Sequence, residues 1–555
     1  MEQEEDKLTN LPKFILGNIL SRLPREDADT TSLLSKAWLE TWYTFPILYF
    51  FDYTTTESIQ PTEDIAGTLE DYSRKSKHFI EYVKRRLLRF WDQSLTIKEC
   101  TFSIFELHCM PNDLDLFLKL VGESGVEVLD LCLPEYRSIY QDEKGWCECY
   151  EVPEYPSIRQ DEIGWGECYV LPKGVIEVKS LTKLVLEGGI RVDQAFTSHS
   201  IKFFSLRELH LVHVLLEDEQ AIERLISCCP LIEMITLMLF GGSMKSLSMH
   251  GLQKLNTVYV DGIKEVYIDE ASRLKSLYYC HDCLNAPFKI DFIQCKYFKE
   301  LLLCLNNTTI ITNKWFLEIF PKFSFLERLE IWNCVLSETI NISSVQLKYL
   351  EVSDCSNLKE ASIDAPNLLL CKFSGFKGSK PIISFLNISS QLEVYLDVLI
   401  DEDLDVFYVR ELLQNIKPEN VLISLSLYIF YSEDAPKPVF LDIPSPPPSI
   451  KHMDLCIPLE VNETFYSYIV DFILLCCVPE TIYWILGYPT NSSRALVELF
   501  YETLRRRKDD TKCWWRDDMK EVEVTRATTK DRTMLKSLSK FMTWSNIYHR
   551  KSFLH

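Results

Sequence analysis

The chain has 555 residues, which exceeds one ordinary globular core, so we expect several domains or an elongated array of repeats. Its composition, 47% hydrophobic and 25% charged, is typical of a folded soluble protein and argues against intrinsic disorder. The formal net charge of −22 argues against bulk nucleic-acid binding, because that binding needs cations to neutralise phosphates.

Two features predict an intracellular protein of the nucleus or cytoplasm. The opening residues, MEQEEDK, lack the apolar core of a secretory signal. The most apolar run, Tyr468–Val478, is short and contains Asp471, whereas a membrane helix needs ~20 residues. Nineteen cysteines in such a chain indicate reduced thiols rather than disulfides. We expect no membrane partner.

The first fifty residues contain two helical patterns. Asn10 is a plausible N-cap and Pro24 ends the first helix, while the second pattern runs from about residue 27 to 43. Apolar residues of the first helix share one stripe: Leu11, Ile15, Ile19, Leu20 and Leu23. A bundle of roughly forty residues cannot bury a self-sufficient core. It therefore either docks onto a partner or caps the following domain.

This segment, residues 4–50, resembles a plant F-box. The residues that carry the resemblance are Leu11-Pro12, Ile15, Ile19-Leu20, Leu23-Pro24, Ala28, Thr31-Ser32, Leu34-Ser35-Lys36, Trp38 and Trp42. The family docks these helices onto the Skp-type adaptor of a cullin ubiquitin ligase. The adaptor-binding residues that the resemblance implies are Leu11, Pro12, Ile15, Ile19, Leu20, Leu23, Pro24, Leu34, Ser35 and Trp38.

After a linker and helix over residues 51–93, polar over 52–78 and helical over 78–90, short apolar strands begin. The pattern Leu-x-x-Leu-x-Leu in VEVLDLCL, SLTKLVLEG, SLRELHLVHV, FLERLEIWNC and QLKYLEVSDC is typical of leucine-rich repeats, in which alternate residues face the core. The motifs KSLSM, KEVYI and KEASI recur at multiples of nineteen residues. The helix and Cys-Pro junction of Leu215–Leu237 resembles that of plant F-box proteins with such repeats.

We therefore expect an α/β fold, a leucine-rich-repeat solenoid (horseshoe) preceded by a small helical F-box and closed by a C-terminal α/β cap. The array covers residues 94–380, degenerate repeats cover 381–490, and the cap covers 491–555, which resembles the terminal helix and strand of the same family. A generic α/β domain with leucine-rich strands is the alternative, and no Gly-rich nucleotide loop supports it.

A tandem duplication lies inside the array at residues 134–171. PEYRSIYQDEKGWCECYEV is followed by PEYPSIRQDEIGWGECYVL, and both copies have the composition of a turn. We interpret them as a copied surface loop, since lengthening a loop costs only about 0.6 kcal/mol for each doubling. A loop that contacts a partner is the alternative. A repeated metal-ligand pair is excluded because Gly166 replaces Cys147 in the second copy.

No catalytic site, metal site or cofactor site is predicted. Cys280-x-x-Cys283 is a lone pair without a second pair at zinc-finger spacing. The chain has no Gly-x-Ser-x-Gly elbow and no phosphate loop, and the acidic stretch at 401–405 lacks the spacing of a calcium loop. We expect a non-enzymatic protein.

The strand pattern predicts which residues face the concave surface, since the leucines point inward. Acidic residues there are Asp130, Glu187, Glu208, Asp261, Glu330 and Glu351, interleaved with Tyr259, Trp332 and Tyr349 and opposed by Lys183 and Arg328. The candidate target-binding residues are Glu208, Tyr259, Glu330, Trp332, Tyr349 and Glu351. We expect this surface to bind a target protein with a basic segment. Reversal of Glu208, Glu330 and Glu351 to Lys should abolish binding of that target. A merely solvated acidic face is the alternative.

These observations predict the substrate receptor of a Skp–cullin–F-box ubiquitin ligase, with an unidentified target protein. A leucine-rich-repeat scaffold with a degenerate F-box is the rival interpretation. A small-molecule hormone receptor of the same architecture is less favoured. Receptors of that kind need a basic pocket for an inositol phosphate, and the acidic repeat array of this chain does not suggest one.

Overall fold

The computed structural model describes two compact units. The first comprises residues up to 399 together with 411–428, and the second comprises 400–410 and the residues after 428. The described residues are 11–51, 65–104, 111–133, 168–192, 203, 205–216, 219–239, 244–280, 289–293, 295, 297–375, 379–400, 406–418, 421–429, 447–456, 472–473 and 475–485.

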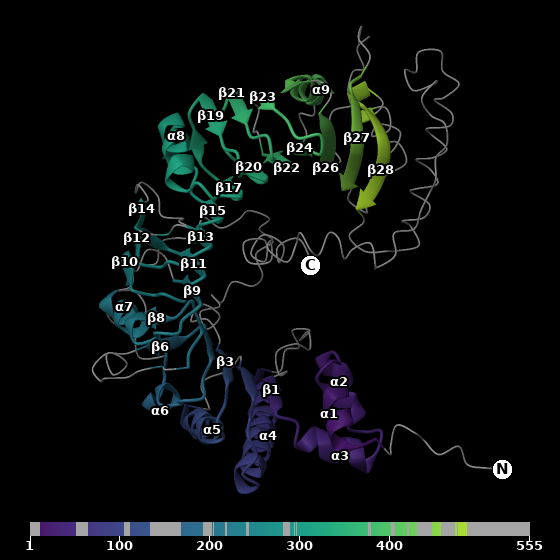
Figure 1. Ribbon diagram of the computed structural model, residues 1–555. Helices are drawn as coiled ribbons and strands as arrows, with labels where there is room; N and C mark the ends of the chain where they lie inside the picture. Colours follow the sequence, from purple (N-terminus) through teal and green to yellow (C-terminus); the bar gives the residue numbers. More distant parts are fainter. Residues whose placement is uncertain are drawn as a thin grey trace, which may run out of the picture. The chain divides into compact units, whose positions relative to one another are not determined.

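Three short helices open the first unit: α1 (Lys13–Leu20), α2 (Arg25–Thr31) and α3 (Lys36–Tyr43) (Figure 1). The prediction of one continuous helix from 27 to 43 was wrong. The chain turns after Thr31, and Ser35 starts a new helix by accepting a hydrogen bond from the backbone N–H of Trp38 at 3.4 Å. The first helix begins after Pro12 rather than at Asn10, which lies outside the described residues.

The linker prediction was also wrong in part, because helix α4 (Ile65–Asp92) occupies much of it. The sheet starts earlier than expected as well. Strand β1 (Ile47–Phe51) pairs in parallel with β2 (Glu99–Ser103), and it buries Leu48 and Phe50. Its sequence, ILYFF, alternates between buried and partly exposed positions as a strand should. The F-box segment therefore runs directly into the sheet.

One long parallel sheet dominates the first unit, on the inner side of a curved stack (Figure 1). After β1 and β2, its strands are β3 (Val128–Cys132), β5 (Lys183–Glu187), β7 (Glu208–Val212), β9 (Met234–Met238), β11 (Thr257–Asp261), β13 (Ser276–Cys280), β15 (Glu300–Cys304), β17 (Arg328–Trp332), β20 (Tyr349–Ser353), β22 (Leu370–Ser374), β24 (Glu393–Ile400) and β26 (Leu422–Ile429). Each strand from β1 to β22 pairs in parallel with the next.

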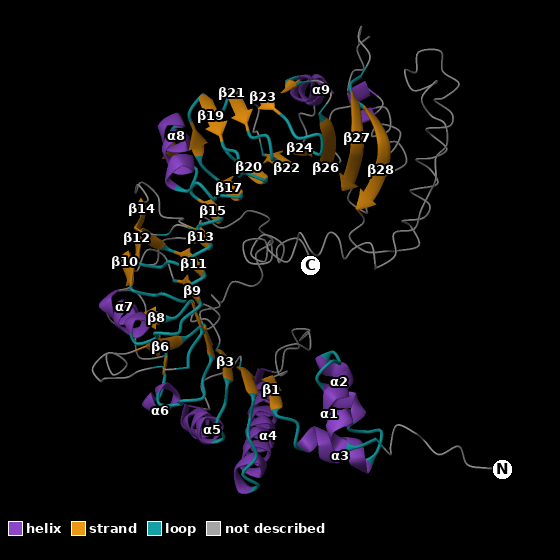
Figure 2. Ribbon diagram, in the orientation of Figure 1, coloured by secondary structure: helices purple, strands orange, loops and turns teal. Residues whose placement is uncertain are grey.

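The register explains the core. The second and fourth residues of successive strands stack in two buried columns, such as Leu184, Leu209 and Ile235 in one and Leu186, Leu211 and Leu237 in the other. Because side chains alternate along a strand, the first, third and fifth residues lie on the opposite face of the sheet. On this face, which we call the inner face, none of the described helices lies (Figure 2).

The outer side consists of helices and short strands (Figure 2). The helices are α5 (Pro111–Glu123), α6 (Lys173–Ile176), α7 (Glu219–Ser227) and α8 (Asn313–Lys322). The strands form four small sheets: β4 (Tyr169–Val170), β6 (Ile190–Val192) and β8 (Leu215–Leu216); β10 (Met244–His250), β12 (Ile263–Asp269) and β14 (Lys289–Ile293); β16 (Ile310–Ile311) and β18 (Val335–Leu336); β19 (Thr339–Ser343), β21 (Glu360–Asp364), β23 (Ile382–Asn387) and β25 (Ile416–Lys417). The recurring KSLSM, KEVYI and KEASI motifs lie in β10, β12 and β21, so that recurrence marks outer strands.

Strands continue beyond residue 380, where degenerate repeats were predicted. The second unit contains the parallel pair β27 (Ser449–Cys456) and β28 (Val478–Ile485), and helix α9 (Val406–Gln414) has residues in both units. The predicted cap at 491–555 and residues 134–167 of the duplication lie outside the described residues. Among the helices that the structure describes, none is both long and apolar enough to cross a membrane.

Candidate interaction surfaces

The three N-terminal helices share a small core. Leu16, Leu20 and Trp38 are buried in it, with Ile19 and Trp42 packed at its edge. Leu20 and Trp38, both predicted as adaptor-binding residues, are only 2% and 3% exposed and hold the bundle together in this structure. Their contact with the adaptor stays a prediction. A helical stripe does not distinguish the residues that hold a bundle together from those that meet its partner.

Other apolar side chains of this bundle remain in solvent. Phe14 on α1 is 76% exposed, and Leu33 and Leu34 in the turn before α3 are 86% and 62% exposed. Leu34 was predicted, whereas Phe14 and Leu33 were missed. Phe14 lies three residues after Leu11, on the side of the helix away from Leu16 and the bundle core, a position that the spacing of the buried residues could have revealed. These three side chains are candidates for contact with a partner, because apolar groups exposed near one another often belong to an interaction surface.

The remaining predicted residues divide by exposure. Pro12 and Pro24 are exposed, Ser35 caps α3, and the half-buried members are Leu11, Ile15, Ile19 and Leu23. They surround the exposed side chains in sequence and can contribute to the rim of a contact.

Arg86 joins helix α4 to this bundle. Its guanidinium lies 4.0 Å from the centre of the Trp42 ring, and its Nη2 donates a hydrogen bond to the backbone carbonyl of Trp42. Arg89 lies over the ring of Tyr43 at 4.3 Å. Burial lowers the pKa of Arg86 to about 10, although the group stays charged at neutral pH. These contacts restrict how the bundle can move relative to α4.

The inner face is strongly acidic. Across strands β2 to β24 it carries three basic residues, Lys183, Arg328 and Lys372, and ten acidic ones: Glu99, Asp130, Glu187, Glu208, Asp261, Glu300, Glu330, Glu351, Glu393 and Asp397. All six acidic residues expected on the concave surface lie on this face. Sequence reasoning missed Glu300 and Lys372, although their strands ELLLC and LCKFS carry them at the same positions.

Lys183, Glu208 and His210 form one cluster on this face. The ammonium of Lys183 lies 2.8 Å from a carboxylate oxygen of Glu208, and His210 hydrogen-bonds to the same oxygen at 3.4 Å. These two contacts, led by the His210 hydrogen bond, lower the pKa of Glu208 to about 2. On the adjacent strand, burial raises the pKa of Asp130 to about 6, and the nearby Glu187 adds to the effect.

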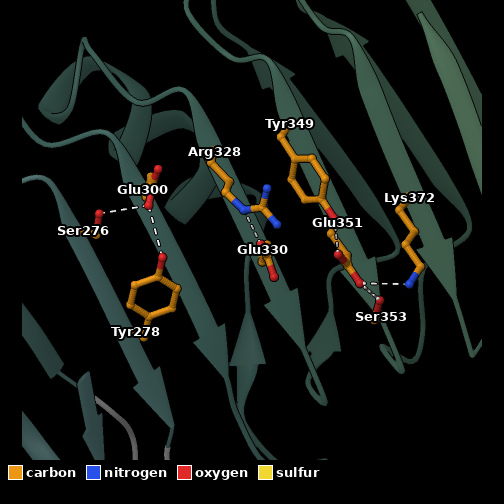
Figure 3. A network of polar contacts seen from close by, with 9 residues as sticks. All are labelled: Ser276, Tyr278, Glu300, Arg328, Glu330, Tyr349, Glu351, Ser353 and Lys372. Atoms are coloured by element: carbon orange, nitrogen blue, oxygen red, sulfur yellow. Dashed lines mark hydrogen bonds and ion pairs between the residues drawn. The ribbon is translucent and has the colours of Figure 1, made fainter. Parts of the chain in front are cut away.

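A second cluster joins β17, β20 and β22 (Figure 3). Arg328 forms an ion pair with Glu330 and lies 3.6 Å from the centre of the Tyr349 ring, while Tyr349 donates its hydroxyl hydrogen to Glu351. Lys372 lies 3.4 Å from Glu351 and, on its other side, 2.9 Å from a carboxylate oxygen of Asp397.

This arrangement changes the role expected for two residues. The side chains of Glu330 and Glu351 are only 5% and 3% exposed. Their carboxylates face the inner surface as predicted, but Arg328 on the same strand pairs with Glu330, and Lys372 on the neighbouring strand pairs with Glu351. They therefore offer little to an incoming partner. The sequence could not show this because Lys372 lies 21 residues after Glu351 and meets it only through strand pairing.

Between these clusters lies an aromatic patch. Tyr259 and Tyr278 stack with ring centres 4.2 Å apart and planes 7° apart. Tyr278 and Ser276 both donate hydroxyl hydrogens to Glu300, at 3.1 and 2.9 Å. Trp332, two strands further on, is half-buried, and its indole N–H is buried without a hydrogen-bond partner among the described residues. Of these, Tyr259 and Trp332 were predicted from the sequence.

Comparison with known protein families gives matches for the N-terminal helical bundle and for the repeat strands. The F-box domain family matches residues 8–49, and the family described as "FBD-associated F-box protein At5g56370, LRR repeats" matches residues 159–296. The second match begins inside the second copy of the duplication, and Tyr169 at the end of that copy lies in β4. The second copy is therefore the one that continues into the repeats.

Similar proteins come from Arabidopsis thaliana. The F-box/LRR-repeat protein At3g58930 is 34% identical over 139 residues, 25% of this chain and 27% of that protein. The F-box/FBD/LRR-repeat protein At1g13570 is 26% identical over 284 residues, 50% of this chain and 54% of that protein. The F-box/LRR-repeat protein At3g26922 is 26% identical over 360 residues, 64% of this chain and 94% of that protein.

The chain thus spans about a quarter and about half of the length of the first two of these relatives. The matches nevertheless agree with the fold, since the F-box match covers the three-helix bundle and the repeat match covers strands of the long parallel sheet. The chain therefore combines a match to the F-box domain with leucine-rich-repeat strands similar to those of F-box proteins found in plants.

Proposed function

We propose that the protein is the substrate-recognition subunit of a Skp–cullin–F-box ubiquitin ligase, working in the nucleus or cytoplasm. Its F-box binds a Skp-type adaptor and through it a cullin, while the repeats bind a target protein. The observation that carries the proposal is the exposure of Phe14, Leu33 and Leu34 on a bundle that matches the F-box. Burial of such side chains against a partner contributes about 1.5–3 kcal/mol each.

The contribution of this chain is positional. Holding a target beside the ligase raises the effective concentration of its lysines at the site of ubiquitin transfer, without any bond chemistry in the receptor. The contacts of Arg86 with Trp42 support this role, because they restrict the motion of the F-box against α4 and so against the start of the sheet. The inner face is the surface we propose for the target, since repeat arrays bind partners there.

Adaptor binding tests the proposal. The full chain is co-expressed with a Skp-type adaptor and purified through a tag on the adaptor. The variant Phe14→Asp/Leu34→Asp should lose co-purification, because both side chains are exposed and their replacement leaves the bundle core intact. Leu20→Asp is a poorer test, since Leu20 is buried and its replacement would unfold the bundle.

Phe325→Asp is the matched control. Phe325 is 47% exposed before β17, so the substitution makes the same chemical change outside the F-box and should leave co-purification unchanged. If the unmodified chain fails to bind any Skp-type adaptor, the alternative of a repeat scaffold with a degenerate F-box is favoured.

A further inference from the structure

Two groups on the inner face have similar composition but differ in one member. In the first, Tyr349 donates its hydroxyl hydrogen to Glu351, the guanidinium of Arg328 lies over the tyrosine ring, and Lys372 pairs with the carboxylate (Figure 3). The protein thus supplies cations to this tyrosine–carboxylate pair from its own neighbouring strands.

In the second group, Tyr278 donates its hydroxyl hydrogen to Glu300 (Figure 3). Tyr259 stacks on the ring of Tyr278. The Ser276 hydroxyl also donates to Glu300, and both hydroxyls bind the same oxygen, Oε2. No Lys or Arg among the described residues pairs with Glu300, and Oε1 has no hydrogen-bond partner there. The group has a carboxylate and aromatic rings but no cation.

Arg328 is the strand partner of Glu300 in the register of β15 and β17, but its guanidinium pairs with Glu330 instead. The three inner-face cations are each engaged: Lys183 with Glu208, Arg328 with Glu330, and Lys372 with Glu351 and Asp397. Seven carboxylates remain in excess of cations on this face, the difference between ten acidic and three basic residues. Such a potential attracts a positively charged partner and repels an acidic one.

We propose that Glu300, Tyr278 and Tyr259 bind an arginine side chain of the target protein, a site that rests on the proposed function of the repeats as a target receptor. The guanidinium donates to Oε1 of Glu300 and packs beside the tyrosine rings. Arginine suits this group better than lysine, since its planar cation both stacks on aromatic rings and donates several hydrogen bonds to one carboxylate. The Arg328–Tyr349 contact shows that the same chemistry already operates on this face.

A peptide-binding measurement tests the site. Fluorescein-labelled hexa-arginine is titrated with the full chain, and binding is followed by fluorescence anisotropy; hexa-citrulline, the neutral analogue, measures the contribution of charge. Glu300→Gln should weaken hexa-arginine binding about tenfold, since hydrogen bonds to a charged group are the strong ones. Glutamine keeps an oxygen that accepts from Ser276 and Tyr278, so the fold should persist.

Glu99→Gln is the matched control. Glu99 occupies the same row of the inner face on β2, so it removes the same charge but has no stacked tyrosine pair beside it. Its effect should stay below about twofold, the size expected of a distant screened charge. Tyr278→Leu, which removes the ring, should also weaken binding, and Tyr278→Phe, which keeps it, should not. Equal losses for Glu300→Gln and Glu99→Gln would overturn the proposal in favour of a general acidic field.

Adaptor co-purification separates this inference from the proposed function. Glu300→Gln should bind the Skp-type adaptor as well as the unmodified chain does. If the unmodified chain binds hexa-arginine through Glu300 but binds no adaptor, the ligase role fails and the arginine site stands. If it binds adaptor and Glu300→Gln leaves hexa-arginine binding unchanged, the arginine site fails and the ligase role stands.

Discussion

Replacing Glu330 by Gln should stabilise the protein at high pH and have little effect at low pH. Burial raises the pKa of Glu330 to about 7, with Arg328 opposing the shift and Glu351 adding to it, whereas the ordinary value is 4.5. Between these values the folded protein holds a proton that the unfolded chain has lost. The free energy of unfolding therefore falls as pH rises from about 4.5 to about 7.

The size of the effect follows from the same two values. Their difference corresponds to at most about 3 kcal/mol, which the folded protein loses in full only above the folded pKa. Gln imitates the protonated carboxyl and cannot ionise. We therefore expect equal stabilities for the two proteins near about pH 4, below the ordinary pKa, and a more stable variant near about pH 8.

Urea unfolding of the full chain, followed by circular dichroism across this pH range, measures the difference. Glu208→Gln is a control of opposite sign: the His210 hydrogen bond and the Lys183 ion pair lower the pKa of Glu208 to about 2, so its stabilisation is present at neutral pH and lost as pH falls below about 4.5. That variant should be less stable near neutral pH. A Glu330→Gln protein that is less stable than the unmodified chain near about pH 8 would show that the ion pair with Arg328 outweighs the cost of burial.

Two further predictions concern the duplication and the F-box junction. Deleting residues 134–152, the first copy, should leave the melting temperature and adaptor binding unchanged. The reason is that the second copy keeps the buried Tyr169, whose hydroxyl donates to Asp115 at 2.5 Å. Loss of cooperative melting would show that the first copy belongs to the array. Arg86→Met should speed hydrogen exchange across residues 36–43 while leaving exchange in β20 and β22 unchanged. The substitution removes the cation over the Trp42 ring and the hydrogen bond to the Trp42 carbonyl. Unchanged exchange in α3 would contradict the restraint we assign to Arg86.

The sequence predicted the repeat strands well because their signal is local. Each strand presents alternating apolar residues, and the pleat alone decides which of them enter the core. The break between α2 and α3 was missed, since Ser32–Ser35 carries no Gly or Pro and only the cap at Ser35 reveals it. The first part of helix α4 was predicted as linker because its sequence is polar. A polar helix is stabilised by the elements it packs against, and the spacing of its apolar residues does not reveal it.

The candidate surfaces were harder to predict because they depend on contacts between distant residues. The helical stripe correctly identified apolar residues of the F-box, but the packing of α1 against α3 decides that Leu20 is enclosed while Phe14 is exposed. On the inner face, strand periodicity placed Glu330 and Glu351 correctly. Whether each carboxylate is free depends on which side chain the adjacent strand brings beside it, and that is set by repeat length and register.

This dependence decides which charge reversals can report on target binding. Reversing Glu330 or Glu351 to Lys would place a third cation beside Arg328 and Lys372 in a nearly enclosed cluster, where like charges repel strongly. Lost target capture by such a variant could then follow from damage to the sheet. Glu300 is half-buried, and its hydrogen-bond partners among the described residues are neutral hydroxyls, so Glu300→Gln changes the charge offered to a target without removing an ion pair there. An informative substitution on this face therefore alters a carboxylate that the protein has not already paired with its own cation.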